Sequence, residues 1–554
     1  MTNNIEKNKE GGIFTVLRRA LPIIAGVLSL LGVGLVLYYI IGPSQYYMTG
    51  DCTDSLLWSQ ATYESGKLVS PDFHYAAVIP FGGNLIFLPF IAIFGYGITA
   101  QICGLALFAV LLFAAIVYLA RGLGYKWYTA GAMLAVTVLV LSSSAKLREI
   151  MWEHIFYYNL GILFFALGMG LAVRIFREGG FIDRGKKRVG DFLTIGVLSV
   201  FAMLAATNGL QSLVCFILPV LGAMFAVIFL DADIKLISKP AMWALAAVLA
   251  VGVFTLVGLK LTDKVTGGVT AGYQDAYSTY SDMGEWTGNF LRLFTNWFSL
   301  LGVSVAKNDP LMSEASIVNI LRIFLAIFLL IAPVVALCGY KSIRSRGVKM
   351  LLIGHFAVSV FIVFASVFGS LGNADWRLTP MLGTAVISTF AYAVDLVSRK
   401  KVAARVGALM LAFLIFASVL SAAEIKGMKK GDQDRYDAHL ITERLEEKGL
   451  EHGYATFWYS QIVTMLSEEQ VKCRVIADGA STPIKRDYQS RDSWYEDVPG
   501  EDRYFLLLTA GENDAMRIWL KANIYRETER FEIKNETTGA TYYVYVYSEN
   551  FVTK

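Results

Sequence analysis

The chain has 554 residues, of which 55% are hydrophobic and 17% charged, and its net charge is +4. An ordinary soluble chain carries roughly a quarter charged residues, so this composition excludes a soluble enzyme, a disordered chain and a nucleic-acid-binding protein. Residues 424–554 hold 24 of the 45 acidic residues, which makes the first 423 residues even more apolar than the average. We therefore expect an α-helical polytopic membrane protein with a small C-terminal α/β domain outside the membrane.

A helix that crosses a bilayer needs roughly 20 mostly apolar residues. Eleven segments satisfy this requirement, and most of them carry no charge near their centre. They are residues 20–41, 99–120, 128–145, 155–173, 191–207, 212–230, 241–259, 317–339, 350–371, 378–397 and 405–423.

A twelfth apolar stretch, Val78–Phe94, is interrupted by prolines, glycines and an asparagine. Counting it as a span would reverse the side of every later loop and would export the basic run from Arg184 to Arg188, against the positive-inside bias. We therefore expect Val78–Phe94 to be an interfacial or re-entrant segment at the outer surface.

The distribution of Lys and Arg sets the orientation. Six inner segments hold 21 of these residues, whereas the outer loops, nearly twice as long in total, hold 8. The bias predicts a multi-pass cell-membrane protein with residues 1–19 in the cytoplasm, a membrane domain over 20–423 and an extracytoplasmic domain over 424–554. The large outer loops are then residues 42–98 and 260–316.

The C-terminal segment alternates helical and strand patterns, as a small α/β domain does. Helices are expected at 432–449, 461–469 and 513–521, and strands at 454–459, 472–476, 504–509, 531–534 and 541–547. Thr538-Gly539 separates the last two strands and indicates a hairpin turn.

The first outer loop carries two carboxylates, Asp51 and Asp54, a few residues after the first span. A general base that serves a lipid-borne substrate must lie at this depth, because the lipid tail stays in the bilayer. The alternative is that both are solvated loop acids, one of which caps the helix that starts near Ser55.

The surroundings of these acids resemble a known family. Asp51, the amphipathic stretch Leu56–Tyr63, Gly66, and the stretch from Leu85 to Gly97 are similar to the opening of the GT-C glycosyltransferases, such as protein mannosyltransferases and lipid A aminoarabinose transferases. The resemblance implies that an acid of this loop is the catalytic carboxylate. The family's adjacent Asp-Glu pair is replaced here by acids three residues apart, so Asp51 and Asp54 both remain candidates, with Asp51 preferred for its distance to Gly66.

The second outer loop follows the third span and contains Glu149, Glu153 and His154. The two glutamates are four residues apart and so share one helical face. In the family this loop assists metal or acceptor binding, and Glu153 and His154 are candidates to hold a divalent metal ion with Asp51. The alternative is that these acids only favour the N-terminus of the fourth span.

Arg377 stands at the outer start of the tenth span, shortly before Pro380. It resembles the family's arginine that holds the lipid phosphate, and a guanidinium offers a fixed fork of donors to phosphate oxygens. Arg292 and Arg322 are weaker candidates for the same role, and an interfacial anchor beside Trp376 is the alternative for Arg377.

The long loop 260–316 is rich in aromatic residues among Gly, Ser, Thr and Asp. Such rings suit the two faces of a sugar, and they suit a membrane interface equally well. They are Tyr273, Tyr277, Tyr280, Trp286 and Trp297.

The resemblance implies an inverting glycosyltransferase that moves a sugar from a polyprenyl-phosphate carrier to a glycan, lipid or protein acceptor on the outer face. Its partners would be that donor, the acceptor and the bilayer, with no nucleic acid, and a divalent metal ion is a candidate cofactor. A secondary transporter or a non-catalytic envelope assembly protein is the alternative. Against a transporter, no inverted repeat is evident and the polar residues gather in outer loops.

The orientation is testable with reporter fusions. A fusion after residue 423 should report an extracytoplasmic position, and fusions at residues 184 and 345 a cytoplasmic one, because Lys and Arg set the orientation. An extracytoplasmic signal at 184 would overturn the eleven-span arrangement.

Overall fold

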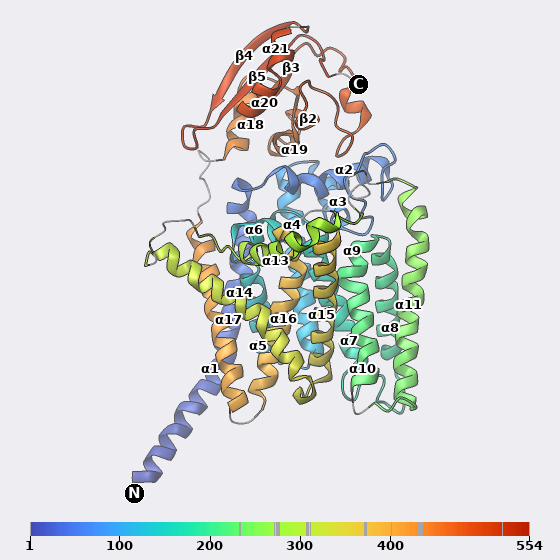
Figure 1. Cartoon of the computed structure of the whole chain (residues 1–554), viewed down its shortest axis with the longest axis vertical. Helices are drawn as coiled ribbons and strands as arrows, with labels where there is room; N and C mark the ends of the chain where they lie inside the picture. Colours follow the sequence, from blue (N-terminus) through green and yellow to red (C-terminus); the bar gives the residue numbers. More distant parts are fainter. Residues whose placement is uncertain are drawn as a thin grey trace.

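The computed structural model describes residues 2–231, 234–270, 272, 278–305, 310, 312–370, 374–399, 402–428, 436–522 and 524–552. Long helices run side by side in a bundle, and a small domain that contains the β-strands stands on one end of it (Figure 1). The N-terminus lies at the opposite end. We call the end that carries the C-terminal domain the domain side.

The predicted spans are confirmed. Ten helices in the described part of the chain are long and apolar enough to cross a membrane, and a bent helix pair makes up to eleven. The long helices are α1 (Thr2–Ile41), α4 (Ile98–Gly122), α5 (Trp127–Val140), α7 (Tyr157–Phe176), α8 (Val189–Ala206), α10 (Leu218–Leu230), α11 (Lys239–Thr266), α14 (Glu314–Cys338), α15 (Arg346–Phe368), α16 (Thr379–Val397) and α17 (Val402–Gly427).

The bent pair corresponds to the third predicted span. Helix α5 ends at Val140, and the following piece Ala145–Glu153 turns away by 117°. The straight apolar helix of this pair is therefore Trp127–Val140, and the second loop begins earlier than expected. This piece consists of α6 (Ala145–Arg148) and the π-helical turn η3 (Glu149–Glu153).

The remaining short helices gather at the domain side (Figure 1). They are α2 (Asp54–Ser65), α3 (Gly83–Phe94), α9 (Leu210–Ser212) and α13 (Trp286–Leu300). Helix α3 has 12 residues, or about 18 Å, which is far less than the roughly 30 Å of a hydrocarbon core. The expectation that Val78–Phe94 does not form a span is confirmed.

Two helices occupy the centre of the bundle. The apolar windows of α7 and α16 are 89% and 83% buried, more than those of the other candidate spans. At the end opposite the domain, the buried Arg346 guanidinium binds Asp231 (2.5 Å) and Asp183 (3.0 Å) and donates to the Phe176 carbonyl (2.8 Å). These bonds hold several loops together there, because a buried guanidinium needs paired acceptors.

The C-terminal domain is built on a five-stranded mixed sheet in the order β2-β1-β3-β5-β4. Strand β1 runs parallel to β2 and β3, while β5 is antiparallel to β3 and β4. The strands are β1 (His452–Ala455), β2 (Lys472–Val475), β3 (Tyr504–Thr509), β4 (Glu527–Lys534) and β5 (Thr541–Tyr547).

Helices cover both faces of this sheet. Residues of α18 (Asp437–Glu447) and α19 (Phe457–Leu466) form one core with alternate residues of β5, such as Val544. Residues near α20 (Ala510–Ala515) and in α21 (Arg517–Ala522) form the second core with the other residues of β5, such as Tyr545. Period-two alternation thus places apolar side chains on both faces of β5.

Two details of the predicted domain were wrong. The first strand was expected over 454–459, but β1 ends at Ala455 because α19 starts at Phe457. The helix expected over 513–521 is two short helices, α20 and α21. The hairpin turn at Thr538-Gly539 is confirmed, with Gly539 at φ +73°.

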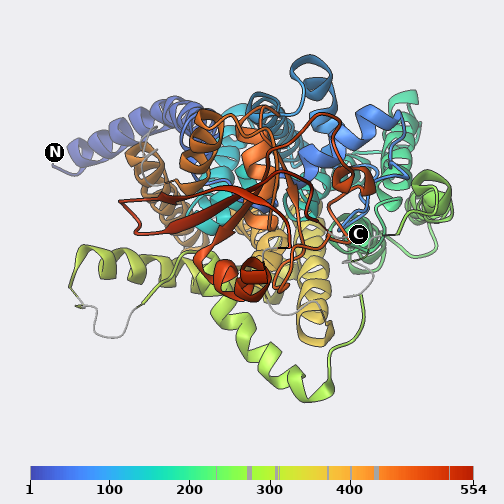
Figure 2. The same cartoon turned by 90° about the horizontal axis from the view of Figure 1, so that it is seen from above.

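The C-terminal domain is fastened to the first domain-side loop, residues 42–98. The Trp58 indole donates to Gln489 Oε1 (2.8 Å), and His74 exchanges backbone hydrogen bonds with Gln489 and Ser490 (2.6 and 2.9 Å). The Arg491 guanidinium forms an ion pair with Glu64. The domain lies over the helices when viewed from above (Figure 2), so part of the first loop lies between the domain and the bundle.

The close approach of α3 to α4 yields a stability prediction. A Cβ added to Gly104 would lie 2.0 Å from the Phe87 ring. Gly104→Leu should lower the thermal unfolding midpoint of the detergent-solubilised protein, because overpacking costs typically about 1–3 kcal/mol. Gly34→Leu is the control, because nothing lies within 4 Å of a Cβ at that position; equal midpoints for the two variants would contradict the packing.

Candidate functional site

The two acids of the first loop follow one another at a helix start. Asp51 lies in the 3₁₀ turn η2 (Gly50–Thr53), and Asp54 is the first residue of α2. An acid in the first turn favours a helix through the helix dipole, and Gly66, at φ +65°, ends α2 in the left-handed conformation that suits glycine. The backbone thus presents two carboxylates three residues apart in different environments.

Asp51 is exposed at the surface of the domain-side loops. Enough protein surrounds its carboxylate to raise its pKa, by desolvation first and by the negative charge of Glu149 second. The positive charges of Lys146 and Arg486 act in the opposite direction. Asp51 therefore combines access to solvent with nearby countercharges, as an ionised base requires.

Asp54 is in the opposite situation. It is 8% exposed, and its Oδ1 atom is buried with no hydrogen-bond partner in the described part of the chain. Desolvation, followed by the charge of Asp51, raises its pKa well above the usual range, while Gln489 and Arg486 lower it. This environment favours the protonated form of Asp54.

The second loop brings Glu149 and Glu153 to the same cluster, at different depths. Glu149 is partly exposed and binds Lys146 Nζ (2.6 Å). Glu153 is 1% exposed, accepts a hydrogen bond from the Tyr39 hydroxyl, and lies 3.9 Å from Cys52 Sγ. Burial raises the pKa of Glu153 to about 8, and Glu149 adds to the shift, so Glu153 is largely uncharged at neutral pH.

His154 follows Glu153 and is also buried. Neither of its ring nitrogens has a hydrogen-bond partner in the described part of the chain. Desolvation and the charge of Lys146 lower its pKa to about 4. The ring is therefore a neutral imidazole, the form that binds metals and accepts hydrogen bonds.

A buried amide joins the two loops. Gln101 Nε2, at the start of α4, donates to the backbone carbonyls of Cys52 (2.8 Å) and Glu153 (2.9 Å). The Asn159 side chain, at the start of α7, donates to the carbonyl of His154 (2.7 Å). The loop acids are thus held by side chains of the helices.

Lys146 extends the cluster towards the turn that carries Arg377. Its Nζ lies 5.2 Å from the centre of the Trp376 ring, and its charge interacts with both Asp51 and Asp375. Arg377 belongs to η7 (Asp375–Leu378), which leads into α16. The structure therefore connects the acids of the first two loops to the neighbourhood of Arg377 through Lys146.

Arg377 itself lines a cavity of about 450 Å³ among the helices at the domain side. This volume suits a drug-sized or lipid-headgroup ligand. The apolar lining includes Val214, Leu218, Phe361, Ile362, Phe364 and Pro380, and the polar lining comes from Tyr157, Tyr158, Gln211, Ser278, Thr279, Tyr280, Ser366 and Arg377. A cationic group in a cavity with many apolar lining residues suits a ligand with an anionic head and an apolar tail.

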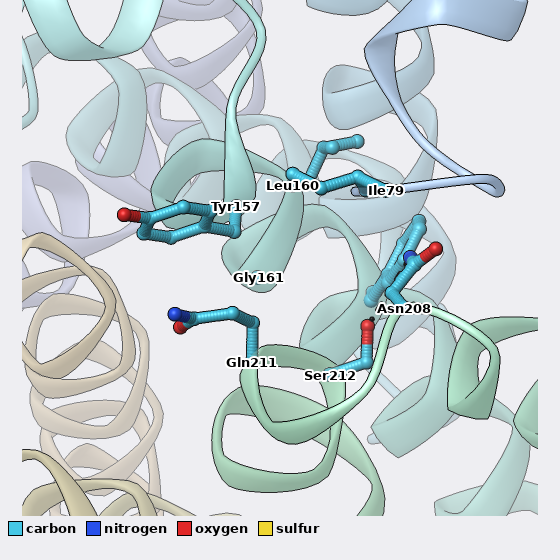
Figure 3. Close-up of a pocket in the computed structure, with 8 residues that line it drawn as sticks. Ile79, Tyr157, Leu160, Gly161, Asn208, Gln211 and Ser212 are labelled. Atoms are coloured by element: carbon cyan, nitrogen blue, oxygen red, sulfur yellow. Dashed lines mark hydrogen bonds between the residues drawn. The ribbon is translucent and has the colours of Figure 1, made fainter. Parts of the chain in front are cut away.

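A pocket of about 10 Å³ adjoins this cavity and shares Tyr157 and Gln211 with it. In Figure 3 the Tyr157 and Gln211 side chains point to the same side, away from Ile79 and Asn208. The Asn208 side chain accepts from the Phe81 backbone N–H (2.9 Å) and donates to the Phe81 carbonyl (2.8 Å). It thereby fixes the first loop against α9.

The other candidate arginines lie elsewhere. Arg322 donates to Glu424 (2.8 Å) and to the carbonyls of Gly302 and Ser143, while Arg148 binds the same Glu424 carboxylate (2.9 Å). Arg292 is exposed on α13 and donates to Asn289 (2.6 Å). Neither Arg322 nor Arg292 lines the cavity that contains Arg377.

The aromatic residues of loop 260–316 are divided. Tyr280 lines the cavity. Trp286 packs on Phe368 with 4.9 Å between ring centres, and the buried Trp297 donates to the Ala326 carbonyl (2.9 Å). Tyr273 and Tyr277 lie outside the described residues. Tyr280 is thus the described member of this set with access to a ligand-sized space.

A metal site at the loop acids stays a prediction. Asp51, Glu153 and His154 are not among the described groups whose ligand atoms lie within 4.8 Å of one another, and Glu153 accepts a hydrogen bond from Tyr39 and is largely protonated. Among the described residues, the group whose ligand atoms lie within 4.8 Å of one another is Glu451, His452 and Glu501, in the C-terminal domain.

Comparison with known proteins identifies the fold. No protein-family model matches the sequence, and no curated protein does. The crystal structure of ArnT from Cupriavidus metallidurans bound to undecaprenyl phosphate is similar at a TM-score of 0.53 and 10% identity, over 98% of this chain and 99% of that one. The apo oligosaccharyltransferase of Archaeoglobus fulgidus has a TM-score of 0.47 and 11% identity, over 92% of this chain and 73% of that one. The chain therefore shares the fold of the ArnT structure over nearly its whole length.

The state of Glu153 yields a pH prediction. Its pKa of about 8 in the folded protein exceeds the ordinary value of 4.5, so unfolding releases its proton and stability falls as the pH rises from about 4.5 to about 8. Glu153→Gln imitates the protonated acid. Its unfolding midpoint should match wild type at pH 5 and exceed it at pH 8.5.

Glu149→Gln is the control from the same segment, because Glu149 is partly exposed beside Lys146. The midpoint of thermal unfolding is measured between pH 5 and 9 for wild type, Glu153→Gln and Glu149→Gln. The assignment is wrong if Glu153→Gln and wild type lose stability equally as the pH rises.

Proposed function

We propose that the protein is a membrane glycosyltransferase that transfers a sugar from a polyprenyl-phosphate carrier to an acceptor at the domain side, on the outer face of the membrane. The observation that carries this proposal is the pairing of two features on one end of the bundle. An exposed carboxylate, Asp51, lies among loop cations, and Arg377 lies in an apolar cavity next to those loops.

The donor fits the cavity by its chemistry. A polyprenyl phosphate has an apolar tail and an anionic head, and Arg377 supplies a permanently charged fork for phosphate oxygens. The similar ArnT structure was solved with undecaprenyl phosphate bound, and we extend that class of ligand to this chain. The tail would contact apolar lining residues such as Phe361 and Phe364.

The carboxylate would act on the acceptor. Asp51 accepts the proton of an acceptor hydroxyl while that oxygen attacks the anomeric carbon of the sugar. The bond between the anomeric carbon and the phosphate oxygen breaks, and polyprenyl phosphate leaves with its negative charge stabilised by Arg377. Direct displacement inverts the configuration at the sugar carbon.

Asp51 suits the base role better than Asp54. A base must be ionised and within reach of the acceptor, and Asp51 is exposed with Lys146 and Arg486 near it. Asp54 is buried in an environment that favours its protonated form. In this proposal Asp54 stabilises the first turn of α2 and influences the electrostatic potential at Asp51.

Catalysis is testable in proteoliposomes with a panel of polyprenyl-phosphate sugars, by measuring release of polyprenyl phosphate. Asp51→Asn keeps the side-chain volume and removes the base, so its rate should fall by about two to four orders of magnitude. Asp54→Asn should keep most of the activity. If Asp54→Asn abolishes release while Asp51→Asn does not, Asp54 is the base. If both variants and the double variant release polyprenyl phosphate at the wild-type rate, the proposed glycosyltransferase activity is wrong.

The phosphate role is tested in the same assay. Arg377→Lys keeps the charge and loses the planar fork, so it should raise the apparent KM for the donor at least severalfold, with intact folding. Arg292→Lys is the matched comparison on α13, outside the cavity. A larger effect from Arg292→Lys would move the phosphate site to α13.

A further inference from the structure

The C-terminal domain places a buried arginine beside the loop acids. The Arg486 side chain is 8% exposed. Its guanidinium lies 4.4 Å from the centre of the Phe457 ring and 4.2 Å from that of Tyr488, and Nη2 is 3.5 Å from Asp478 Oδ2. The two rings and this carboxylate hold the guanidinium in one place.

One nitrogen of this guanidinium makes no hydrogen bond to the described part of the chain. Nη1 of Arg486 is buried and has no hydrogen-bond partner in the described part of the chain. Buried polar groups in folded proteins are nearly always paired, and each exception calls for an explanation. The guanidinium cannot lose its proton to escape this cost, so an absent acceptor is the physical explanation.

The position of Arg486 relative to Asp51 follows from backbone packing. Gly50, which precedes Asp51, lies so close to α19 that an added Cβ would be 2.6 Å from the Phe457 carbonyl oxygen. The ring of the same Phe457 carries Arg486. Phe457 of the C-terminal domain therefore packs against both Gly50, through its backbone, and the Arg486 guanidinium, through its ring.

Arg486 is nevertheless not a direct partner of the acids. Within the described residues, its ion pair is with Asp478, and none within 4.0 Å joins it to Asp51 or Asp54. Its charge still lowers the pKa of both carboxylates. The cation thus lies near the proposed base without being neutralised by it.

We propose that Arg486 binds an anionic group, a phosphate or a carboxylate, of the acceptor, so that the C-terminal domain completes the acceptor site that Asp51 begins. This inference rests on the glycosyltransferase function proposed above. A guanidinium matches both kinds of oxyanion with parallel hydrogen bonds. The acceptor is the ligand concerned because Arg486 belongs to the domain outside the bundle, whereas Arg377 lies with the membrane helices.

The anchoring of the segment around Arg486 supports a binding role. Gln489 and Ser490 are tied to the first loop through Trp58 and His74. Arg486 is thereby preorganised next to the loop that carries Asp51, which reduces the entropy lost when a ligand binds. A group bound there would place a neighbouring hydroxyl of the acceptor near Asp51.

The test measures binding to the full chain in nanodiscs of neutral lipid. The probes are inorganic pyrophosphate and glucuronate as soluble anions, glucose as a neutral control, and undecaprenyl phosphate. The proteins are wild type, Arg486→Gln, Arg486→Lys, Arg377→Lys and Arg444→Gln. Arg444 is the matched control because it is half exposed in the same domain and pairs with Glu447 on its own helix.

We expect wild type and Arg444→Gln to bind at least one soluble anion and not glucose. Arg486→Gln should weaken that binding at least tenfold, Arg486→Lys should weaken it less, and Arg486→Gln should leave undecaprenyl phosphate binding unchanged. Arg377→Lys should weaken undecaprenyl phosphate binding and leave soluble-anion binding unchanged. If Arg486→Gln does not fold, the comparison of Arg486→Lys with wild type carries the test, because the planar fork is lost at constant charge.

Two results would overturn the inference: equal soluble-anion binding by Arg486→Gln and wild type, or loss of undecaprenyl phosphate binding in Arg486→Gln, which would assign Arg486 to the donor. Failure of the proposed function looks different. In that case wild type would not bind undecaprenyl phosphate, whatever Arg486→Gln does to soluble anions.

Discussion

The arrangement of the loop acids depends on the buried amide of Gln101. From the first turns of α4 it donates to the backbone carbonyls of Cys52 and Glu153, which belong to two different loops. A fully buried amide with two such acceptors is costly to break, because each carbonyl would be left unsatisfied. Asp51, one residue before Cys52, and Glu149, four residues before Glu153, therefore keep a fixed relation to each other.

Most of the charged candidate residues lie in the domain-side loops and the C-terminal domain, and most of the apolar cavity lining lies among the helices. The cavity that contains Arg377 is lined mostly by apolar side chains of spanning helices. The acids and Lys146 lie in loops, and Arg486 reaches them from the C-terminal domain. Charged groups are expensive inside a bilayer, so the chain concentrates them where water and the domain meet the bundle.

Much of the fold was predictable, and the complete site was not. The ten long apolar helices and the bent pair in the described part of the chain follow from hydropathy, because the bilayer requires roughly 20 apolar residues per helix. Asp51, Glu149 and Arg377 were selected as candidate site residues from their places next to the predicted spans. Lys146 stands in the same segment as Glu149, so a search for loop cations beside acids would have found it.

Arg486 follows Asp51 by more than 400 residues, and only tertiary packing through Phe457 brings the two together. The protonation of Glu153 results from its burial, against the effect of the hydrogen bond from Tyr39, and no local pattern reveals this burial. Position next to a predicted span therefore selects the candidate residues, while burial determines the charge that each of them carries. Desolvation drives Glu153 and Asp54 towards their neutral forms. Asp51, which is exposed and whose raised pKa is partly offset by the charges of Lys146 and Arg486, is therefore the acid of the first loop best placed to carry a negative charge.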